Sequence, residues 1–323
     1  MAIVVIGNVF LDIKGFPFDN YIPAGRNAGK VEFVHGGVGR NLCEDIANLE
    51  LRPVFVSMVD DTPQGESVVR KLKNHKVNTD YVISTPDGMG MWLAVFNETG
   101  DVAGSISKRP KMEALTRLIQ EKGDEIFCDA DSIVLEIDME KDLVKQVFYF
   151  AEKYKKKVYA VVSNMSIASE RRDFIKKTDC FVCNEQEAEI LFVDSFEGLE
   201  PEEMCNKLSE VIKNADIPSM IITLGSRGAV YADIHGDKGY FPADKINVRD
   251  TTGAGDAFCA GAATGLTYGK TLREAVEIGT RLAASVLTVS ENVCPRFLPQ
   301  ELGIDPENIT RISLFGEDAD FPK

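Results

Sequence analysis

Long apolar segments and positive charge are both scarce in this sequence of 323 residues. No stretch approaches the roughly 18 consecutive apolar residues of a membrane-spanning helix. The first residues (MAIVVIG) lack the basic region of a signal peptide. Lysine and arginine number 36 against 51 aspartates and glutamates, so most of the surface would repel a polyanion. These absences predict a cytoplasmic protein that binds neither membranes nor nucleic acid.

Histidine is also rare, with three in the chain, and the seven cysteines are scattered. Cysteines in apolar segments, such as Cys43, Cys128 and Cys259, are typical of reduced thiols in a core. Cys180 and Cys183 have the CxxC spacing of a zinc or redox site, but a zinc site needs a second such pair or histidines. We therefore interpret these two cysteines as core residues of a strand.

Short apolar runs, by contrast, are frequent, and they alternate with segments of helical period. Strands are expected at 3–6, 53–58, 132–135, 158–162, 180–183 and 220–223. Helices are expected at 40–49, 64–75, 141–154, 167–177, 185–192 and 201–214. This alternation predicts a doubly wound α/β fold, in which a mostly parallel sheet carries helices on both faces.

Two intervals interrupt this rhythm, at 14–33 and 88–107. The first is rich in glycine, proline and asparagine, and the second alternates β-prone residues around a turn. We predict that both are insertions in a single domain spanning 1–323, and that together they form a small β lid.

The run from Asp250 to Asp256 (DTTGAGD) carries the strongest chemical signal. Small residues ahead of a helix leave backbone N–H groups unpaired, and the helix dipole favours an anion at that end. A phosphate group would fit there. Asp256 is then either a helix cap or, beside a phosphate, a general base for an attacking hydroxyl. The residues alone leave both interpretations open.

A second glycine-rich segment, from Gly265 to Thr271, imitates a phosphate-binding P-loop. It is one residue short of the GxxxxGK[ST] pattern, and it follows a helix where a P-loop follows a strand. Thr271 and Glu274 instead have the spacing of a capping box. This spacing predicts the end of one helix and the start of the next.

Near the N-terminus, Gly36, Gly37 and Asn41 also lead into a helix. Paired glycines let a ligand approach the backbone, and an asparagine both donates and accepts hydrogen bonds, which suits a polyhydroxylated molecule. Asp12 is a natural acceptor for hydroxyl groups, although a loop aspartate is often only a turn residue. The first strand lacks the GxGxxG that would indicate a dehydrogenase.

Taken together, these segments resemble the ribokinase-like, or PfkB, family of sugar and nucleoside kinases over nearly the whole chain. Gly36, Gly37 and Asn41 resemble its N-terminal signature, and the run from Asp250 to Asp256 resembles its C-terminal signature. Between them lie segments similar to its DxxxG, NxxE and TxGxxG motifs, at Asp61 to Gly65, Asn184 to Glu187 and Thr223 to Gly228. Five elements in family order make chance similarity a poor explanation.

The resemblance implies a role for each matching residue. Asp256 would deprotonate the acceptor hydroxyl, and charge on the γ-phosphate of ATP would be held by the N–H groups of Gly253, Ala254, Gly255 and Asp256. The ATP site would be lined by Asn184, Thr223, Gly225 and Gly228. The acceptor would be bound by Asp12, Gly37 and Asn41. Mg²⁺ would be organised, through water, by Glu187 together with Asn184.

Asp250 and Thr252 lie where many members of the family bind a monovalent cation such as K⁺. Those members carry a later Arg-x-Gly-Ala pattern, whereas residues 290–293 of this chain are Ser-Glu-Asn-Val. This difference argues against K⁺ dependence.

Within the family the sequence looks most like pseudouridine kinases, which implies pseudouridine as the acceptor and its 5′-phosphate as the product. The similarity lies in residues 12–15, 29–31 and 36–41. Phe10 stands where those kinases and ribokinases commonly have asparagine, so a ribokinase- or fructokinase-like activity is the alternative. A ligand sensor without catalysis and an unrelated α/β enzyme are the other two hypotheses. The lid would cover the acceptor, and its surface could pair two copies of the chain.

Overall fold

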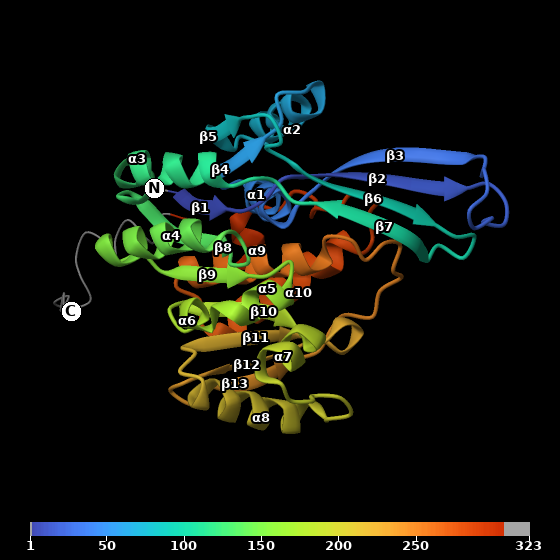
Figure 1. The fold of residues 1–323 in the computed structure, drawn as a ribbon. Coiled ribbons are helices and arrows are strands. Elements are labelled where there is room, and N and C mark those ends of the chain that lie inside the picture. Colours follow the sequence, from blue (N-terminus) through green and yellow to red (C-terminus); the bar gives the residue numbers. More distant parts are fainter. Residues whose placement is uncertain (1, 307–323) are drawn as a thin grey trace.

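The computed structural model of the chain describes residues 2–306. In this part of the chain, the strands form one nine-stranded sheet and a separate four-stranded sheet (Figure 1). The large sheet is composed, from edge to edge, of β13 (Lys238–Phe241), β12 (Ala229–Asp233), β11 (Ser219–Thr223), β10 (Cys180–Asn184), β9 (Val158–Val161), β8 (Ala130–Glu136), β1 (Ala2–Ile6), β4 (Val54–Val59) and β5 (Asn78–Ser84). Its strands are parallel except β12 and β13, which are added antiparallel at one edge.

Helices cover both faces of the large sheet. One face carries α1 (Val38–Asn48), α2 (Pro63–Asn74), α9 (Ala254–Thr267) and α10 (Leu272–Val286). The other carries α3 (Glu113–Phe127), α4 (Lys141–Lys153), α5 (Met165–Ala168), α6 (Arg172–Ile175), α7 (Glu185–Phe192) and α8 (Pro201–Asn214). Short 3₁₀ turns lie at η1 (Ser169–Arg171), η2 (Gly225–Arg227) and η3 (Pro299–Leu302).

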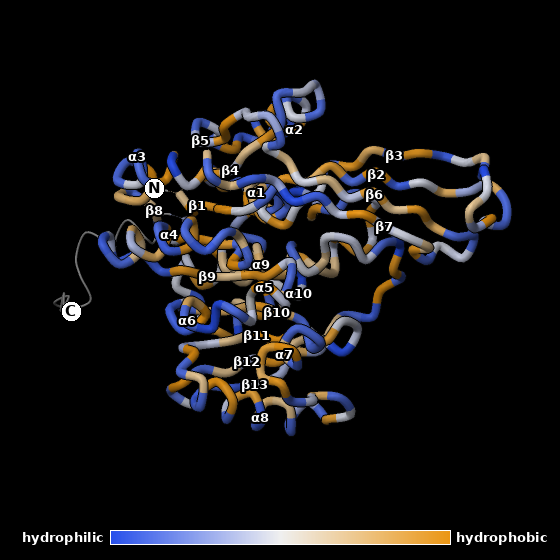
Figure 2. The backbone as a smooth tube through the Cα atoms, viewed as in Figure 1, coloured by the Kyte–Doolittle hydropathy of each residue, from blue (hydrophilic) through white to orange (hydrophobic). Residues whose placement is uncertain are grey.

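The central strands are apolar throughout because both of their faces are buried. In β1, Ile3 and Val5 pack into the core beneath α1 and α9, whereas Val4 and Ile6 pack into the opposite core. The tube in Figure 2 is accordingly hydrophobic along β1 and β9. A parallel sheet covered on both sides requires this composition, so the predicted doubly wound fold is confirmed.

The small sheet follows directly from β1 and projects beyond the large one (Figure 1). Its order is β3 (Gly29–Gly36), β2 (Phe10–Pro17), β6 (Gly90–Phe96) and β7 (Val102–Lys108). Strand β2 pairs antiparallel with β3 and parallel with β6. Segments that are far apart in the sequence, such as β2 and β6, therefore lie side by side.

Two sequence predictions need correction. The helix expected at 167–177 is divided into α5, η1 and α6, where the Ser169 hydroxyl donates to the Ser166 carbonyl oxygen (3.0 Å) and competes with regular helix bonding. Cys128 is exposed rather than buried, because it caps the C-terminus of α3. The other six cysteines are buried free thiols.

The predicted helix boundary after α9 is confirmed. Helix α9 ends at Thr267, and the Thr271 side chain caps α10 with Glu274 as the reciprocal member of a capping box. The segment that imitates a P-loop is thus a connection between two helices. Among the helices within residues 2–306, none is long and apolar enough to cross a membrane.

Candidate active site

The first turn of α9 begins at Gly253, a position that only glycine can readily occupy. Gly253 has a φ of 83°, in the left-handed region, and a Cβ atom there would collide with the main-chain oxygen of Asn292. The amides of Gly255 and Asp256 lie in the first turn, where no helix carbonyl is available to accept from them. Space is open beside Gly255. The helix start therefore offers donors to an anion, as its sequence predicts.

A cavity of about 700 Å³ opens beside this helix start. Thr223, Gly225 and Gly228 line one side of it, and Ala254 and Gly255 line another. The remaining walls come from residues 243–248 and from α10. The cavity thus joins three of the four sequence-predicted nucleotide residues to the predicted phosphate site, whereas Asn184 does not line it. Its size suits a nucleotide-sized ligand.

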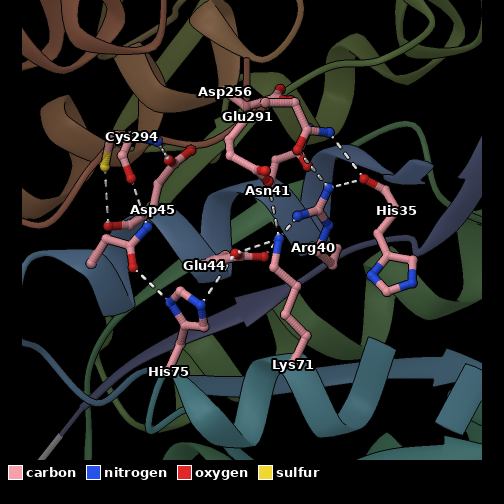
Figure 3. A network of polar contacts seen from close by, with 12 residues as sticks. His35, Arg40, Asn41, Glu44, Asp45, Lys71, His75, Asp256, Glu291 and Cys294 are labelled. Carbon is pink, nitrogen blue, oxygen red and sulfur yellow. Dashed lines mark hydrogen bonds and ion pairs between the residues drawn. The ribbon is translucent and has the colours of Figure 1, made fainter. Parts of the chain in front are cut away.

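Asp256 lies in the same first turn and is paired with Asn41 of α1. The Asn41 Nδ2 atom donates to Asp256 Oδ2 at 2.6 Å, although the two residues are 215 positions apart (Figure 3). Burial raises the pKa of Asp256 to about 6, and the hydrogen bond from Asn41 and the charge of Arg40 limit the rise. At neutral pH the carboxyl is therefore ionised, yet it is more basic than an ordinary aspartate, which suits a general base.

A buried ion pair holds the neighbouring part of α1 in place. Arg40 is 1% exposed and donates to Glu44 Oε2 (2.7 Å), to Asn292 Oδ1 (3.1 Å) and to the His35 carbonyl oxygen. Glu44 is paired from its other side by Lys71 (3.0 Å). Because the main chain of Asn292 contacts Gly253, Arg40 links α1 to the start of α9. Sequence analysis missed this residue, although a charge within an apolar helix could have indicated it.

Asn184 and Glu187 form a capping box at the start of α7. Asn184 Oδ1 accepts from the Glu187 amide (2.9 Å), and Glu187 Oε2 accepts from the Asn184 amide (2.8 Å). Burial raises the pKa of Glu187, and the negative charge of Asp138 acts in the same direction. The Glu187 charge also raises the pKa of Asp256.

This arrangement fits Mg²⁺ held through water better than a metal enclosed by protein. Residues 2–306 contain no group of three or more acidic, histidine or cysteine side chains that could hold an ion. Mg²⁺ usually keeps several waters and is bound by one or two carboxylates together with substrate phosphates. Glu187 is the carboxylate that the sequence predicts for this role.

Two further acids lie at the C-terminal end of β8, and sequence analysis singled out neither. The Ser163 hydroxyl is 2.9 Å from Glu136 Oε1 and 2.8 Å from Asp138 Oδ2. The Ser163 hydroxyl therefore links the two carboxyls. Burial and the charge of Asp138 raise the pKa of Glu136, and Arg109 pairs with Asp138 (3.0 Å).

Arg109 connects this acid pair to the small sheet. It is the first residue after β7, so its ion pair with Asp138 ties the return strand of the small sheet to the large sheet. The glycine at the other connection is equally constrained. Gly37 has a φ of 98°, and a Cβ atom there would strike the Asn8 carbonyl oxygen. The two points at which the chain leaves the small sheet, at Gly37 after β3 and at Arg109 after β7, are therefore constrained.

Asp12 shares its face of the small sheet with an aromatic cluster. Asp12 and Trp92 are register partners on β2 and β6, so both side chains project to the same side. Trp92 packs edge-on against Phe96 (6.4 Å), which stacks on Phe16 (4.6 Å). Burial raises the pKa of Asp12. Sequence analysis did not single out Trp92, because its position beside Asp12 depends on strand register.

The remaining predicted residues show local contacts. Asp250 Oδ1 accepts from the Thr252 amide (2.9 Å) in a turn before α9. Phe10, which stands where a polar residue is common in the resembling kinases, lies with its ring against Gly90. Asn41, expected to bind the acceptor, is 5% exposed with its amide against Asp256.

The sequence matches the pfkB family of carbohydrate kinases over residues 2–294, and the chain belongs to this family. It is therefore an enzyme that transfers phosphate to a hydroxyl group of a sugar or nucleoside. The family expected from the sequence motifs is thereby confirmed.

Its relatives include both nucleoside and sugar kinases. The chain is 32% identical over 292 residues to the guanosine-inosine kinase of Exiguobacterium acetylicum, which covers 90% of this chain and 95% of that protein. It is 25% identical over 287 residues to the pseudouridine kinase of Escherichia coli strain K12, covering 88% and 90% of the two chains. The fold is similar to that of Arabidopsis thaliana ribokinase complexed with ribose and ATP, with a TM-score of 0.81, 21% identity and coverage of 98% and 100%.

Proposed function

We propose that this protein is an ATP-dependent kinase that phosphorylates the 5′-hydroxyl of a nucleoside. The observation that carries the proposal is the start of α9, where Ala254 and Gly255 line a cavity of about 700 Å³ and Asp256 is the next residue of the same turn. A base and an anion site at one helix end are what phosphoryl transfer to a hydroxyl requires.

The proposed reaction uses these groups in one displacement. Asp256 accepts the proton of the 5′-hydroxyl while the 5′-oxygen of the nucleoside bonds to the γ-phosphorus. The bond from that phosphorus to the β,γ-bridging oxygen breaks and releases ADP. Amides of Gly255 and Asp256 hold the negative charge that develops on the phosphoryl oxygens. Thr223, Gly225 and Gly228 bind the nucleotide in the cavity. Asp12 and Gly37 orient the acceptor.

Glu187 and Asn184 are the proposed magnesium residues, acting through water. Bound Mg²⁺ would neutralise phosphate charge in a protein whose formal charge is -15. Activity should disappear in excess chelator and return on addition of Mg²⁺. Full activity in chelator would contradict this assignment. We further propose that K⁺ is not required.

A nucleoside explains the acceptor face better than a free sugar. Trp92 and Phe96 give the Asp12 face aromatic rings against which a base can pack, whereas a free sugar would leave them uncovered. The guanosine-inosine kinase relative favours a purine nucleoside of that class as the acceptor. Pseudouridine, which sequence analysis favours, is the second candidate, supported by the relative at 25% identity.

A substrate series tests this proposal. We would compare kcat/KM for guanosine, inosine, pseudouridine, uridine, ribose and fructose with Mg-ATP. We expect guanosine or inosine to have the highest value and each free sugar to have a much lower one. Preference for pseudouridine would establish the second candidate. A free sugar exceeding every nucleoside would replace the proposal with a ribokinase- or fructokinase-like activity.

We also propose that the small sheet is a lid over the acceptor and that its outer face pairs two copies of the chain. Phe33, Ile13, Leu93 and Ile106 are register partners across the four strands and form one apolar row. Phe33 and Ile106 are 62% and 70% exposed in the single chain. A homodimer in the cytoplasm, where the free thiols stay reduced, would cover this row.

A further inference from the structure

Two buried acceptor atoms on α1 have neither a hydrogen-bond donor nor an ion pair among the described residues. They are Asn41 Oδ1 and Asp45 Oδ2. Asn41 is 5% exposed and Asp45 is fully buried, so solvent reaches neither atom. A buried acceptor without a partner is costly, which makes two of them beside one catalytic residue a feature that needs an explanation.

The orientation of Asn41 is set by its contact with Asp256. An ionised carboxylate can only accept hydrogen bonds, so the Asn41 amide must turn its Nδ2 atom toward Asp256. Its Oδ1 atom then points away from Asp256. The two carboxyl oxygens of Asp45 also differ. Asp45 Oδ1 accepts from the Cys294 amide at 2.6 Å, whereas Asp45 Oδ2 has no donor.

The two unpartnered atoms belong to residues one helical turn apart. Residues i and i+4 lie on the same side of a helix, so Asn41 and Asp45 are neighbours on the side of α1 that meets α9 and the segment 291–294 (Figure 3). A single proton on Asp45 Oδ2 would satisfy both atoms. It would turn Asp45 into a donor and give Asn41 Oδ1 the partner that it lacks.

We propose that Asp45 is a neutral carboxylic acid that donates to Asn41 Oδ1 and thereby positions the Asn41 amide against the base Asp256. Asp45 is then a positioning residue that acts on the reaction through Asn41. This inference rests on the proposed function, in which Asp256 is the base.

The surroundings of Asp45 favour the neutral acid. The titratable and charged groups near it are Cys294, Asp256 and Cys259 on α9, and Arg40 and Cys43 on its own helix. Arg40 is already engaged with Glu44, Asn292 and His35, so Asp45 has no cation of its own. Burial raises the pKa of Asp45 well above its ordinary value, and the negative charge of Asp256 adds to this effect.

The resulting chain of donors runs in one direction, from Asp45 to Asn41 to Asp256. Two nearby aspartates thus take opposite protonation states, because one is paired with a donor and the other is enclosed without a cation. Without the Asp45 donor, the Asn41 Oδ1 atom would keep no partner, and the amide would lose the contact that holds it in place. The hydrogen bond that limits the pKa of Asp256 would then be weakened.

Three variants separate a positioning role from a packing role. Asp45→Asn keeps an acceptor for the Cys294 amide and supplies an N–H donor to Asn41 Oδ1. Asp45→Leu has a similar volume and no donor. Asn41→Ala removes the middle of the chain. We would measure kcat/KM against pH, together with nucleotide affinity and thermal unfolding.

We expect Asp45→Asn to rescue the activity that Asp45→Leu loses, with a difference in kcat of about tenfold or more between the two. The acid limb of the Asp45→Leu profile should move to higher pH, as in Asn41→Ala, because Asp256 has lost a donor. Nucleotide affinity should be little changed. Equal kcat and equal acid limbs in Asp45→Asn and Asp45→Leu would overturn the inference.

A spectroscopic measurement keeps the inference testable if Asp45→Leu fails to fold. The infrared difference between the wild type and Asp45→Asn should contain the carbonyl band of one neutral carboxylic acid at neutral pH. A carboxylate band in its place would overturn the inference. Failure of the proposed function has a different signature, since Asp256→Asn would then retain turnover whatever the state of Asp45.

Discussion

The large and small sheets of this kinase bury their residues in opposite ways. The central strands of the large sheet are enclosed by helices on both faces, and Val5, Ile6 and Phe55 are inaccessible to solvent. The small sheet has no helix on its outer face, where Phe33 and Ile106 are largely exposed. Both layers nevertheless contribute residues to one candidate site, with Asp256 on α9, which covers the large sheet, and Asp12 on the small sheet.

The difference in burial indicates that the two sheets have different roles in the proposed reaction. Groups that must keep a fixed geometry during phosphoryl transfer belong to the rigid layer, where Asp256 is bonded to Asn41 and Arg40 anchors α1 to Asn292. Groups that choose the acceptor belong to the small sheet, which is tied to the large sheet by Arg109. Changes in the first region should therefore affect kcat, and changes in the second should affect KM.

The largest effect is expected from Asp256→Asn. This change keeps the shape of the side chain and removes the base, so kcat should fall about a thousandfold or more while ATP affinity stays nearly constant. Steady-state kinetics and calorimetric titration with ATP would measure the two quantities. A variant with near wild-type kcat would exclude Asp256 as the base.

The pH dependence should reveal the same group in the wild type. Because burial raises the pKa of Asp256 to about 6, the base is ionised above this pH and protonated below it. We expect kcat/KM to fall about tenfold for each pH unit below that value. A buffer series at constant ionic strength would measure it. An acid limb that persists unchanged in Asp256→Glu and Asn41→Ala would point to another group.

A smaller effect, confined to KM, is expected from Trp92→Ala. Loss of a stacked base should raise KM for the nucleoside about tenfold and leave kcat and the KM for ATP nearly unchanged. Leu93→Ala is the matched control, because Leu93 lies on the opposite face of the same strand. Equal effects of the two substitutions would contradict stacking.

Trp92 also provides a binding signal, as the sole tryptophan of the chain. Nucleosides should change its fluorescence at concentrations where ribose does not. A response to ribose equal to that of the nucleoside would place the sugar, and not the base, beside Trp92.

The outer face of the small sheet should control assembly with little effect on chemistry. Phe33→Lys and Ile106→Lys place charges in the apolar row, so the proposed dimer should dissociate. Because both side chains are exposed in the single chain, the stability of the monomer should change by less than about 1 kcal/mol. Sedimentation velocity would measure the assembly. A wild-type protein that sediments as a monomer at high concentration would exclude the dimer.

The smallest effect is expected from the choice of monovalent cation. Replacing K⁺ by a large organic cation at constant ionic strength should change kcat/KM less than about twofold, since the buried Arg40 already holds the segment that contacts Gly253. A strong activation by K⁺ would instead assign a cation to the turn at Asp250 and Thr252.

Several features were predictable because their signals are local. Apolar runs indicate the central strands, since burial on both faces requires them over a few consecutive residues. Gly253 and Asp256 belong to a motif whose small residues and helix start lie within one short segment. The capping box at Thr271 likewise depends on residues three apart. By contrast, nothing in the sequence of 167–177 showed that the Ser169 hydroxyl would bond to the main chain and that this helix would break.

The contacts that complete the site were decided by the tertiary structure. Asn41 and Asp256 are separated by 215 residues, and Arg40 and Asn292 by 252. Trp92 lies beside Asp12 only because β2 and β6 pair in one register, and a shift of one residue would turn Trp92 to the other face. The sequence by itself determined the strands, the helix ends and the family. Strand register and crossover connections decided which polar groups meet, because they act over distances that local periodicity does not encode.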